Sequence, residues 1–173
     1  KIYTTLFFFF YCYSYVHAKP NNEQRNKINS TQIKQTYRFE ELPDNGTYTI
    51  KMRNISGDVK VIGKEASGGL ITLERIFFGL KNEQEILQAH KLESANIKHF
   101  FEDSLIQILG IRDTHSGKEI TKNLYFELPK HVNIDFKIDG GNYTIKDMKG
   151  TSLLETLGGD ISIENLSGNI NLN

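Results

Sequence analysis

The chain has 173 residues, which fits a single domain, and its 21 basic and 21 acidic residues give a formal net charge of zero. It has no basic run or tail to neutralise phosphates, which argues against nucleic-acid binding. The one cysteine, Cys12, lies in an apolar stretch near the start. A mature protein without that stretch has no cysteine, which excludes a thiol nucleophile, a disulfide framework and a cysteine-based metal site.

Residues 1–18 have the pattern of a secretory signal peptide. Lys1 precedes an apolar run that ends at Val16, and Val16 and Ala18 fit the −3 and −1 positions of a cleavage site. The run is shorter than the roughly 20 residues of a spanning helix, so cleavage after Ala18 is favoured over an uncleaved membrane anchor. We therefore expect an exported protein, located in the periplasm, on the outer surface or secreted, that is not an integral membrane protein after cleavage.

Residues 19–36 are polar, with scattered isoleucines and no hydrophobic period. This composition predicts a disordered linker. We expect the folded domain to span residues 37–173.

Within 37–173 the dominant hydrophobic period is two, which is typical of strands with one buried face. Apolar and polar residues alternate strictly over 131–138, and a second alternating run stops at Pro129, which cannot donate to a ladder. Asp103-Ser104 predicts a hairpin turn between two shorter strands. The expected inward residues are Ile71, Leu73, Ile97, His99, Phe101, Ile106, Ile108, Leu124, Phe126, Leu128, Val132, Ile134, Phe136 and Ile138.

One segment breaks this pattern. Residues 82–91 contain good helix formers, and Asn82 followed by Glu85 has the spacing of a capping box. We expect one short helix here, packed on a sheet through Ile86, Leu87 and His90.

The most specific signal is an internal repeat, because residues 141–150 align with 159–168 without a gap. Each unit opens with a glycine pair, continues with a short alternating strand and an Asp or Asn bend, and closes with a glycine before a second strand begins. Two strands and two corners in 18 residues predict an all-β, β-solenoid-like stack. The alternative is a coincidental pair of glycine-rich hairpins.

A broken copy of the repeat lies upstream. Residues 46–51 match the first half and 54–57 the second, with Val59 and Val61 in the following strand. The sequence stops midway through a unit, and we expect the natural protein to continue with further coils and a cap. The expected corners, where glycine allows positive φ or close backbone approach, are Gly46, Gly57, Gly140, Gly141, Gly150, Gly158, Gly159 and Gly168.

In this order, the segments 55–63, 128–134 and 156–163 resemble the putative-adhesin family of bacterial envelope proteins, a β-strand-repeat domain with no assigned activity. The resemblance covers residues 37–173. It implies an exported, β-solenoid-like domain without known catalytic residues. The 82–91 helix departs from the family pattern.

Metal binding has little support in the sequence. His90, His99, His115 and His131 are scattered, without the i+2 or i+4 spacing of ligand pairs. The glycine-flanking acids would suit a calcium β-roll, but the roll's glycine-aspartate pattern is absent. The acids that flank the glycines are Asp58, Asp139, Asp147 and Asp160. We expect no metal or cofactor.

We expect a non-enzymatic cell-envelope protein with a structural, adhesive or surface-binding role, without catalytic residues. Its partner is unknown, with a surface glycan or an envelope protein as candidates. One alternative is a carbohydrate-active β-helix enzyme, a polysaccharide lyase or hydrolase, using paired carboxylates among Asp135, Glu155 and Glu164. Another is a periplasmic component of envelope-stress sensing.

Overall fold

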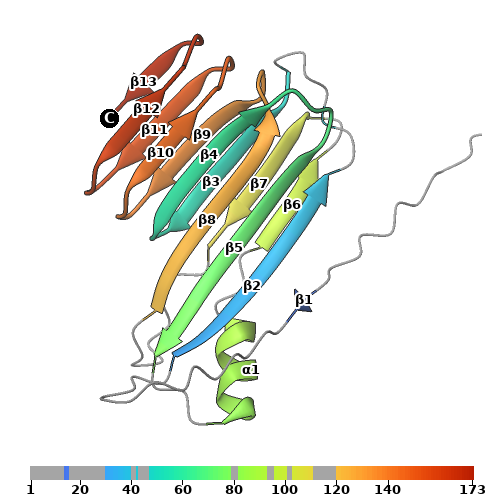
Figure 1. Cartoon of the computed structure of the whole chain (residues 1–173), viewed down its shortest axis with the longest axis vertical. Coiled ribbons are helices and arrows are strands. Elements are labelled where there is room, and N and C mark those ends of the chain that lie inside the picture. Colours follow the sequence, from blue (N-terminus) through green and yellow to red (C-terminus); the bar gives the residue numbers. More distant parts are fainter. Residues whose placement is uncertain are drawn as a thin grey trace, which may run out of the picture.

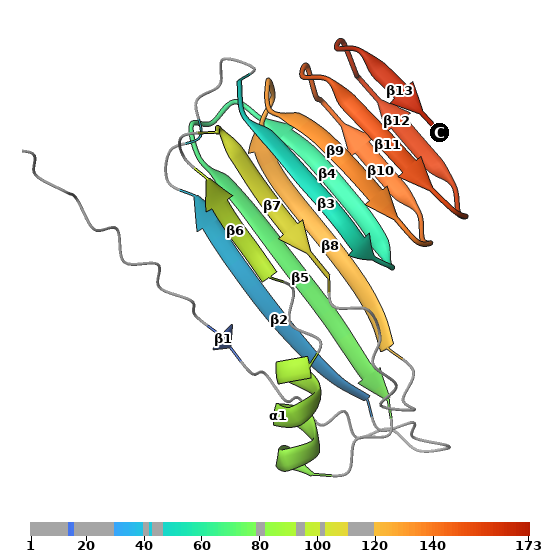
Figure 2. The same cartoon turned by 180° about the vertical axis from the view of Figure 1, so that it is seen from behind.

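The computed structural model describes residues 14–15, 30–39, 42, 47–78, 82–92, 96–100, 103–110 and 120–173. Most of them lie in two mixed β-sheets that face each other (Figures 1 and 2). In spatial order, sheet A contains β1 (Ser14–Tyr15), β2 (Ser30–Phe39), β5 (Gly69–Phe78), β8 (Ile120–Pro129), β4 (Asp58–Lys64), β10 (Tyr143–Lys146) and β12 (Ile161–Glu164). Sheet B contains β13 (Ile170–Leu172), β11 (Ser152–Thr156), β9 (Asn133–Ile138), β3 (Thr49–Ile55), β7 (Leu105–Leu109) and β6 (Asn96–Phe100). Within these described ranges, no helix is long and apolar enough to cross a membrane.

The two repeat units lie side by side as parallel strands. Tyr143 pairs with Ile161 and Ile145 with Ile163, so the 18-residue offset of the sequence is also the register of β10 and β12. The following strands, β11 and β13, pair in parallel in sheet B. From β9 onward the chain alternates between the sheets (Figure 1). Parallel pairing excludes the alternative of two adjacent hairpins, because a hairpin joins antiparallel strands.

The upstream copy is shifted by one strand from the predicted alignment. Val59 pairs with Tyr143, whereas Ile50 pairs with Ile134 in the opposite sheet. The predicted match of Val59 and Val61 to the second strand of each repeat is therefore wrong, because they belong to the column of β10 and β12. Strands of both sheets share the same apolar alternation, so the sequence pattern could not tell one sheet from the other. Gly46 lies outside the described residues.

The remaining strands add the antiparallel pairs β2–β5, β5–β8 and β6–β7, and join the repeat strands through the parallel pairs β4–β8 and β3–β7. The predicted linker is wrong for residues 30–36. Strand β2 pairs with β5 along its whole length, from Ser30 opposite Phe78 to Phe39 opposite Gly69. Gln35 occupies a buried position of this strand where an apolar residue would be expected, so the sequence does not show the apolar alternation of a strand. The predicted signal peptide and the rest of the linker lie outside the described residues, apart from the two-residue strand β1, which pairs with β2.

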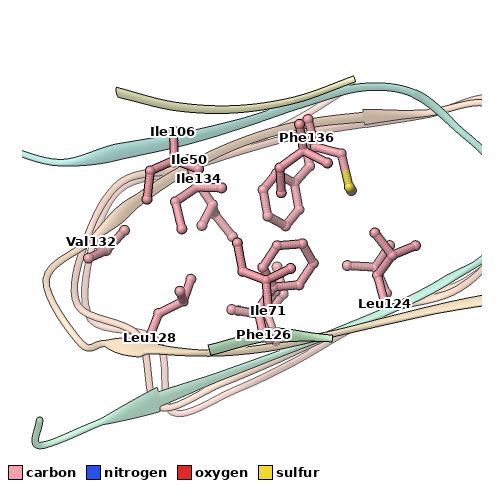
Figure 3. Close-up of a cluster of buried hydrophobic side chains, with 14 of the residues drawn as sticks. Ile50, Ile71, Ile106, Leu124, Phe126, Leu128, Val132, Ile134 and Phe136 are labelled. Carbon is pink, nitrogen blue, oxygen red and sulfur yellow. The ribbon is translucent and has the colours of Figure 1, made fainter. Parts of the chain in front are cut away.

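The core lies between the sheets, and the predicted alternation is confirmed there. Phe126 of sheet A meets Phe136 of sheet B with ring centroids 5.0 Å apart (Figure 3). Each such fully buried side chain contributes about 1.5–3 kcal/mol to stability. On β6, Ile97 and His99 are only partly buried, and Phe101 lies outside the described residues. The predicted inward residues that are buried are Ile71, Leu73, Ile106, Ile108, Leu124, Phe126, Leu128, Val132, Ile134, Phe136 and Ile138.

The predicted helix is present as α1 (Glu83–Leu92). Asn82 caps it, because its Oδ1 accepts a hydrogen bond of 2.9 Å from the backbone N–H of Glu85. Ile86 packs against Ile33 and Phe77, which face inward from sheet A, so α1 covers the same side of that sheet as sheet B (Figure 2). The predicted packing of Leu87 is wrong, since its side chain is 62% exposed. The side chain of His90 lies outside the description.

The corner glycines differ in what they require. Gly57, Gly141 and Gly159 have positive φ and lie on one another, and a Cβ added to any of them would clash with a backbone carbonyl oxygen 2.0–2.2 Å away. The first glycines of the pairs, at 140 and 158, have ordinary φ and face open space. Gly150 and Gly168 have ordinary φ, but an added Cβ would lie 2.3 Å and 2.1 Å from the carbonyl oxygens of Val132 and Gly150.

Candidate binding face

The outer face of sheet A, turned away from sheet B, presents a row of side chains that runs across six strands. Alternation points these residues outward, because the neighbours of each on its strand are buried or partly buried on the inner face. The Oγ1 atoms of Thr36 and Thr72 are 3.5 Å apart, as expected for neighbours in such a row. We call this set the hydroxyl row; in spatial order it consists of Thr36, Thr72, Tyr125, Lys60, Thr144 and Ser162.

Two neighbours at the centre of the row are both exposed. Tyr125 of β8 is 41% exposed and stands opposite Lys60 of β4 in the parallel ladder. Within the described part of the chain, neither side chain has a hydrogen-bond or ion-pair partner. An exposed ring beside an unpaired ammonium group is therefore available to a ligand.

Several other charges on this face are paired, while Arg38, Lys64 and Glu127 are exposed without a partner in the described structure. Lys34 lies 3.1 Å from Glu74, and Lys146 pairs with Glu164. Burial acts to raise the pKa of Glu74, but hydrogen bonds from Asn123, Lys34 and Gln32, with the charge of Lys34, bring that pKa below its usual value. Glu74 is therefore held as a carboxylate that already has its partners.

The outer face of sheet B is crossed by ion pairs instead. Both carboxylate oxygens of Asp135 accept hydrogen bonds of 2.6 Å from Nη2 of Arg53. Lys137 lies 2.6 Å from Glu155. Phe100 of β6 is 39% exposed on this side of the molecule. The charges at the centre of this face are therefore paired, and the exposed Lys98 lies at its edge on β6, two residues from Phe100.

Of the three acids considered for glycan cleavage, Asp135 and Glu155 point outward from neighbouring strands of sheet B, and Glu164 lies on sheet A. Each is paired with a basic side chain: Asp135 with Arg53, Glu155 with Lys137 and Glu164 with Lys146.

The glycine-flanking acids form structural columns at the corners. Oδ1 of Asp58 accepts a hydrogen bond of 2.9 Å from the backbone N–H of Asn142. In the next coil, Oδ1 of Asn142 accepts a hydrogen bond of 2.9 Å from the backbone N–H of Asp160. At the other corner, Asn165 Nδ2 donates to Oδ1 of Asp147 at 3.0 Å. Asp139 is exposed at the turn before Gly140. In the described ranges no group of three or more His, Cys, Asp or Glu side chains is placed to hold a metal ion.

The histidines are likewise not brought together in the described structure. His99 lies against aromatic rings, with its Nε2 3.2 Å from the hydroxyl of Tyr48 and its ring edge-on to Phe39. Burial lowers the pKa of His99, which favours the neutral imidazole. His131 lies in the turn after β8, while His115 and the side chain of His90 lie outside the described residues.

The sequence did not single out Tyr125 and Lys60. Their alternation predicts that both point outward, but they are far apart in the chain and become neighbours only through the pairing of β4 with β8. No local pattern encodes that pairing, because a parallel ladder joins distant segments.

The fold is similar to that of a solved structure, a putative cell adhesion protein from Clostridium sporogenes. The TM-score is 0.52 and the sequence identity is 12%, and the match covers 80% of this chain and 67% of that one. At this identity the likeness shows the fold alone. No protein-family model matches the chain, and no curated protein matches it significantly.

Proposed function

We propose that this chain is an exported, non-enzymatic β-repeat protein of the bacterial cell envelope, which binds a surface ligand through the outer face of sheet A. The proposal includes kinship with the putative-adhesin family. It is supported by the order of the glycine-containing segments and by the fold shared with a protein described as a putative cell adhesion protein.

The observation that carries the binding role is the pair Tyr125 and Lys60. A solvated sheet face usually presents scattered polar groups, and exposed aromatic residues are enriched where proteins meet ligands. Here an exposed ring and an unpaired cation share one row with four hydroxyl side chains.

Ladders and corner contacts support a preformed backbone for part of this face. We propose that β3–β4 and β9–β13 form a β-solenoid-like stack, in which each coil holds the next through parallel ladders and the corner columns of Asp and Asn. A ligand that spans several strands would then meet a preformed surface, which lowers the entropic cost of binding. The ion pairs of Asp135, Glu155 and Glu164 support a role that is not catalytic.

The test is co-sedimentation of the purified protein with washed cell envelopes of the source organism. We expect the wild-type protein to sediment with the envelopes, and Tyr125→Ala to reduce the bound fraction severalfold. Phe100→Ala is the matched control, because it removes an aromatic side chain of similar exposure from the other sheet. Circular dichroism checks that both variants are folded.

Two results would count against the proposal. If wild type and Tyr125→Ala sediment equally, the ligand does not use this face. If the protein releases soluble oligosaccharides from the envelopes over time, it is an enzyme, and the carbohydrate-active alternative takes precedence.

A further inference from the structure

We infer that the ligand of the hydroxyl row is a polysaccharide whose sugars carry carboxylate groups, as uronates do. This inference deepens the proposed binding function and rests on it. It comes from the chemistry of Lys60, Tyr125 and the hydroxyl groups on either side of them.

Lys60 supplies the charge preference. It is exposed, and it is the only charged member of the hydroxyl row. On the same face Lys34 and Lys146 are already paired with Glu74 and Glu164, and the exposed Lys64 and Arg38 lie outside the row. An unpaired ammonium group attracts an anion and donates charge-assisted hydrogen bonds to it, which selects a carboxylate over a neutral hydroxyl.

Tyr125 supplies the preference for a sugar over another anion. The C–H face of a pyranose ring is apolar and packs on an aromatic ring, while its hydroxyl groups stay at the rim. Tyr125 is flanked by Thr72 on one side and Lys60 on the other. A uronate stacked on the ring would have a hydroxyl partner and a cationic partner one strand away on either side, at about 4.8 Å spacing.

The length of the row favours a polymer over a monosaccharide. Beyond Lys60 the row continues through Thr144 and Ser162, and beyond Thr72 it reaches Thr36. These hydroxyl groups both donate and accept hydrogen bonds, so they suit successive sugar hydroxyls without demanding one orientation. A chain lying across the strands would contact all six side chains.

Two exposed acidic residues on the face oppose an acidic ligand, namely Glu127 and Asp58, which precedes Lys60 by two residues on β4. Glu127 follows Tyr125 by two residues on β8, is exposed, and stands opposite Leu70 and Ile62, which carry no charge. Its carboxylate weakens the attraction of Lys60 for an anion. Removing the Glu127 charge should therefore strengthen binding, which gives the inference a gain-of-affinity test.

The experiment measures binding of the full purified chain to immobilised polygalacturonate and to the same polymer after its carboxyl groups are reduced to alcohols. We expect wild type to bind polygalacturonate at least about fivefold more tightly than the reduced polymer. Lys60→Gln should lose that preference, while Lys146→Gln, which removes a lysine already paired with Glu164, should keep it. Glu127→Gln should bind polygalacturonate about twofold more tightly.

Polyglutamate, a carboxylate polymer without sugar rings, separates charge from stacking. We expect it to bind more weakly than polygalacturonate, and Tyr125→Ala to reduce only the binding of polygalacturonate. Equal binding of the two polyanions would overturn the sugar assignment. Equal binding of polygalacturonate and its reduced form would overturn the acidic class. In both cases envelope binding that depends on Tyr125 would leave the proposed function standing.

Discussion

Gly141 lies directly on Gly57, so that a Cβ added to Gly141 would sit 2.1 Å from the Gly57 carbonyl oxygen. Its φ of 116° adds strain for any L side chain. We predict that Gly141→Ala lowers the free energy of unfolding by about 3 kcal/mol, because the coils must separate to admit the methyl group. Urea or thermal unfolding followed by circular dichroism measures the change.

The neighbouring glycine provides the control. An added Cβ on Gly140 meets nothing within 4 Å, so Gly140→Ala should change stability by no more than about 0.5 kcal/mol. Equal losses at both positions would show that the glycine pair acts through general turn flexibility and not through close packing of the coils.

The hydroxyl of Tyr143 ties the two sheets together inside the stack. It donates to the carbonyl oxygen of Glu155 at 3.1 Å, and it lies 3.4 Å from that of Phe136. Tyr143→Phe keeps the ring and removes this bond, so we expect a loss of about 1 kcal/mol in unfolding free energy. Tyr125→Phe, at an exposed position, should leave stability unchanged.

The same tyrosine predicts sensitivity to alkaline conditions. Burial raises the pKa of Tyr143 above its ordinary value of 10.0. A raised pKa in the folded state means that the stabilising effect is complete below pH 10 and is lost as the pH rises towards the folded pKa. The stability difference between wild type and Tyr143→Phe should therefore shrink above about pH 10. A constant difference would mean that this phenol does not titrate on unfolding.

His99 predicts an effect on the acidic side. Burial lowers its pKa below 6.5, so the neutral ring stabilises the fold above that pH, and this contribution is lost as the pH falls through the folded pKa. We expect the melting temperature to fall as the pH decreases from 7 towards 5, and to fall less steeply in His99→Gln. Titration of the His99 ring by NMR provides an independent readout, and a pKa at or above 6.5 would contradict the prediction.

Arg53 makes four hydrogen bonds, two of them to the carboxylate of Asp135. Besides its two bonds to the Asp135 carboxylate, its Nη1 donates to the backbone oxygens of Asp135 and Met52 at 2.7 Å and 2.8 Å. A lysine cannot reproduce this fork, so Arg53→Lys should cost about 1 kcal/mol of unfolding free energy. Lys137→Gln is the comparison and should cost less than about 0.5 kcal/mol, because its pair with Glu155 is more exposed.

The sequence predicted the features that depend on neighbouring residues. The alternation at 131–138, the Asn82 cap and the 18-residue register each follow from local spacing. Features that depend on distant segments were missed. The polar but buried Gln35 interrupts the apolar alternation of β2, so the sequence did not predict this strand, which pairs with β5. Val59 was assigned to the second strand of the repeat, although it pairs with Tyr143 of the first.

The candidate site shows the same division. Outward orientation of Tyr125 and Lys60 follows from period two, but their adjacency depends on a ladder between β8 and β4. The spacing of the glycine-corner acids allowed a calcium site to be considered, although none was expected, but it did not predict that Asp58 and Asn142 accept hydrogen bonds from the backbone of the next coil. Composition alone cannot separate these roles, because both use the same oxygen atoms.

The constant register of β10 on β12 and of β11 on β13 has an evolutionary consequence. Duplicating or deleting one whole turn in the gene would lengthen or shorten the sandwich while every remaining ladder, corner and inward side chain kept its place. Loss of a single codon within a strand would instead exchange the core and solvent faces beyond it. Variation among relatives should therefore occur in steps of one turn, so that the reach of the molecule changes while its surface chemistry is preserved.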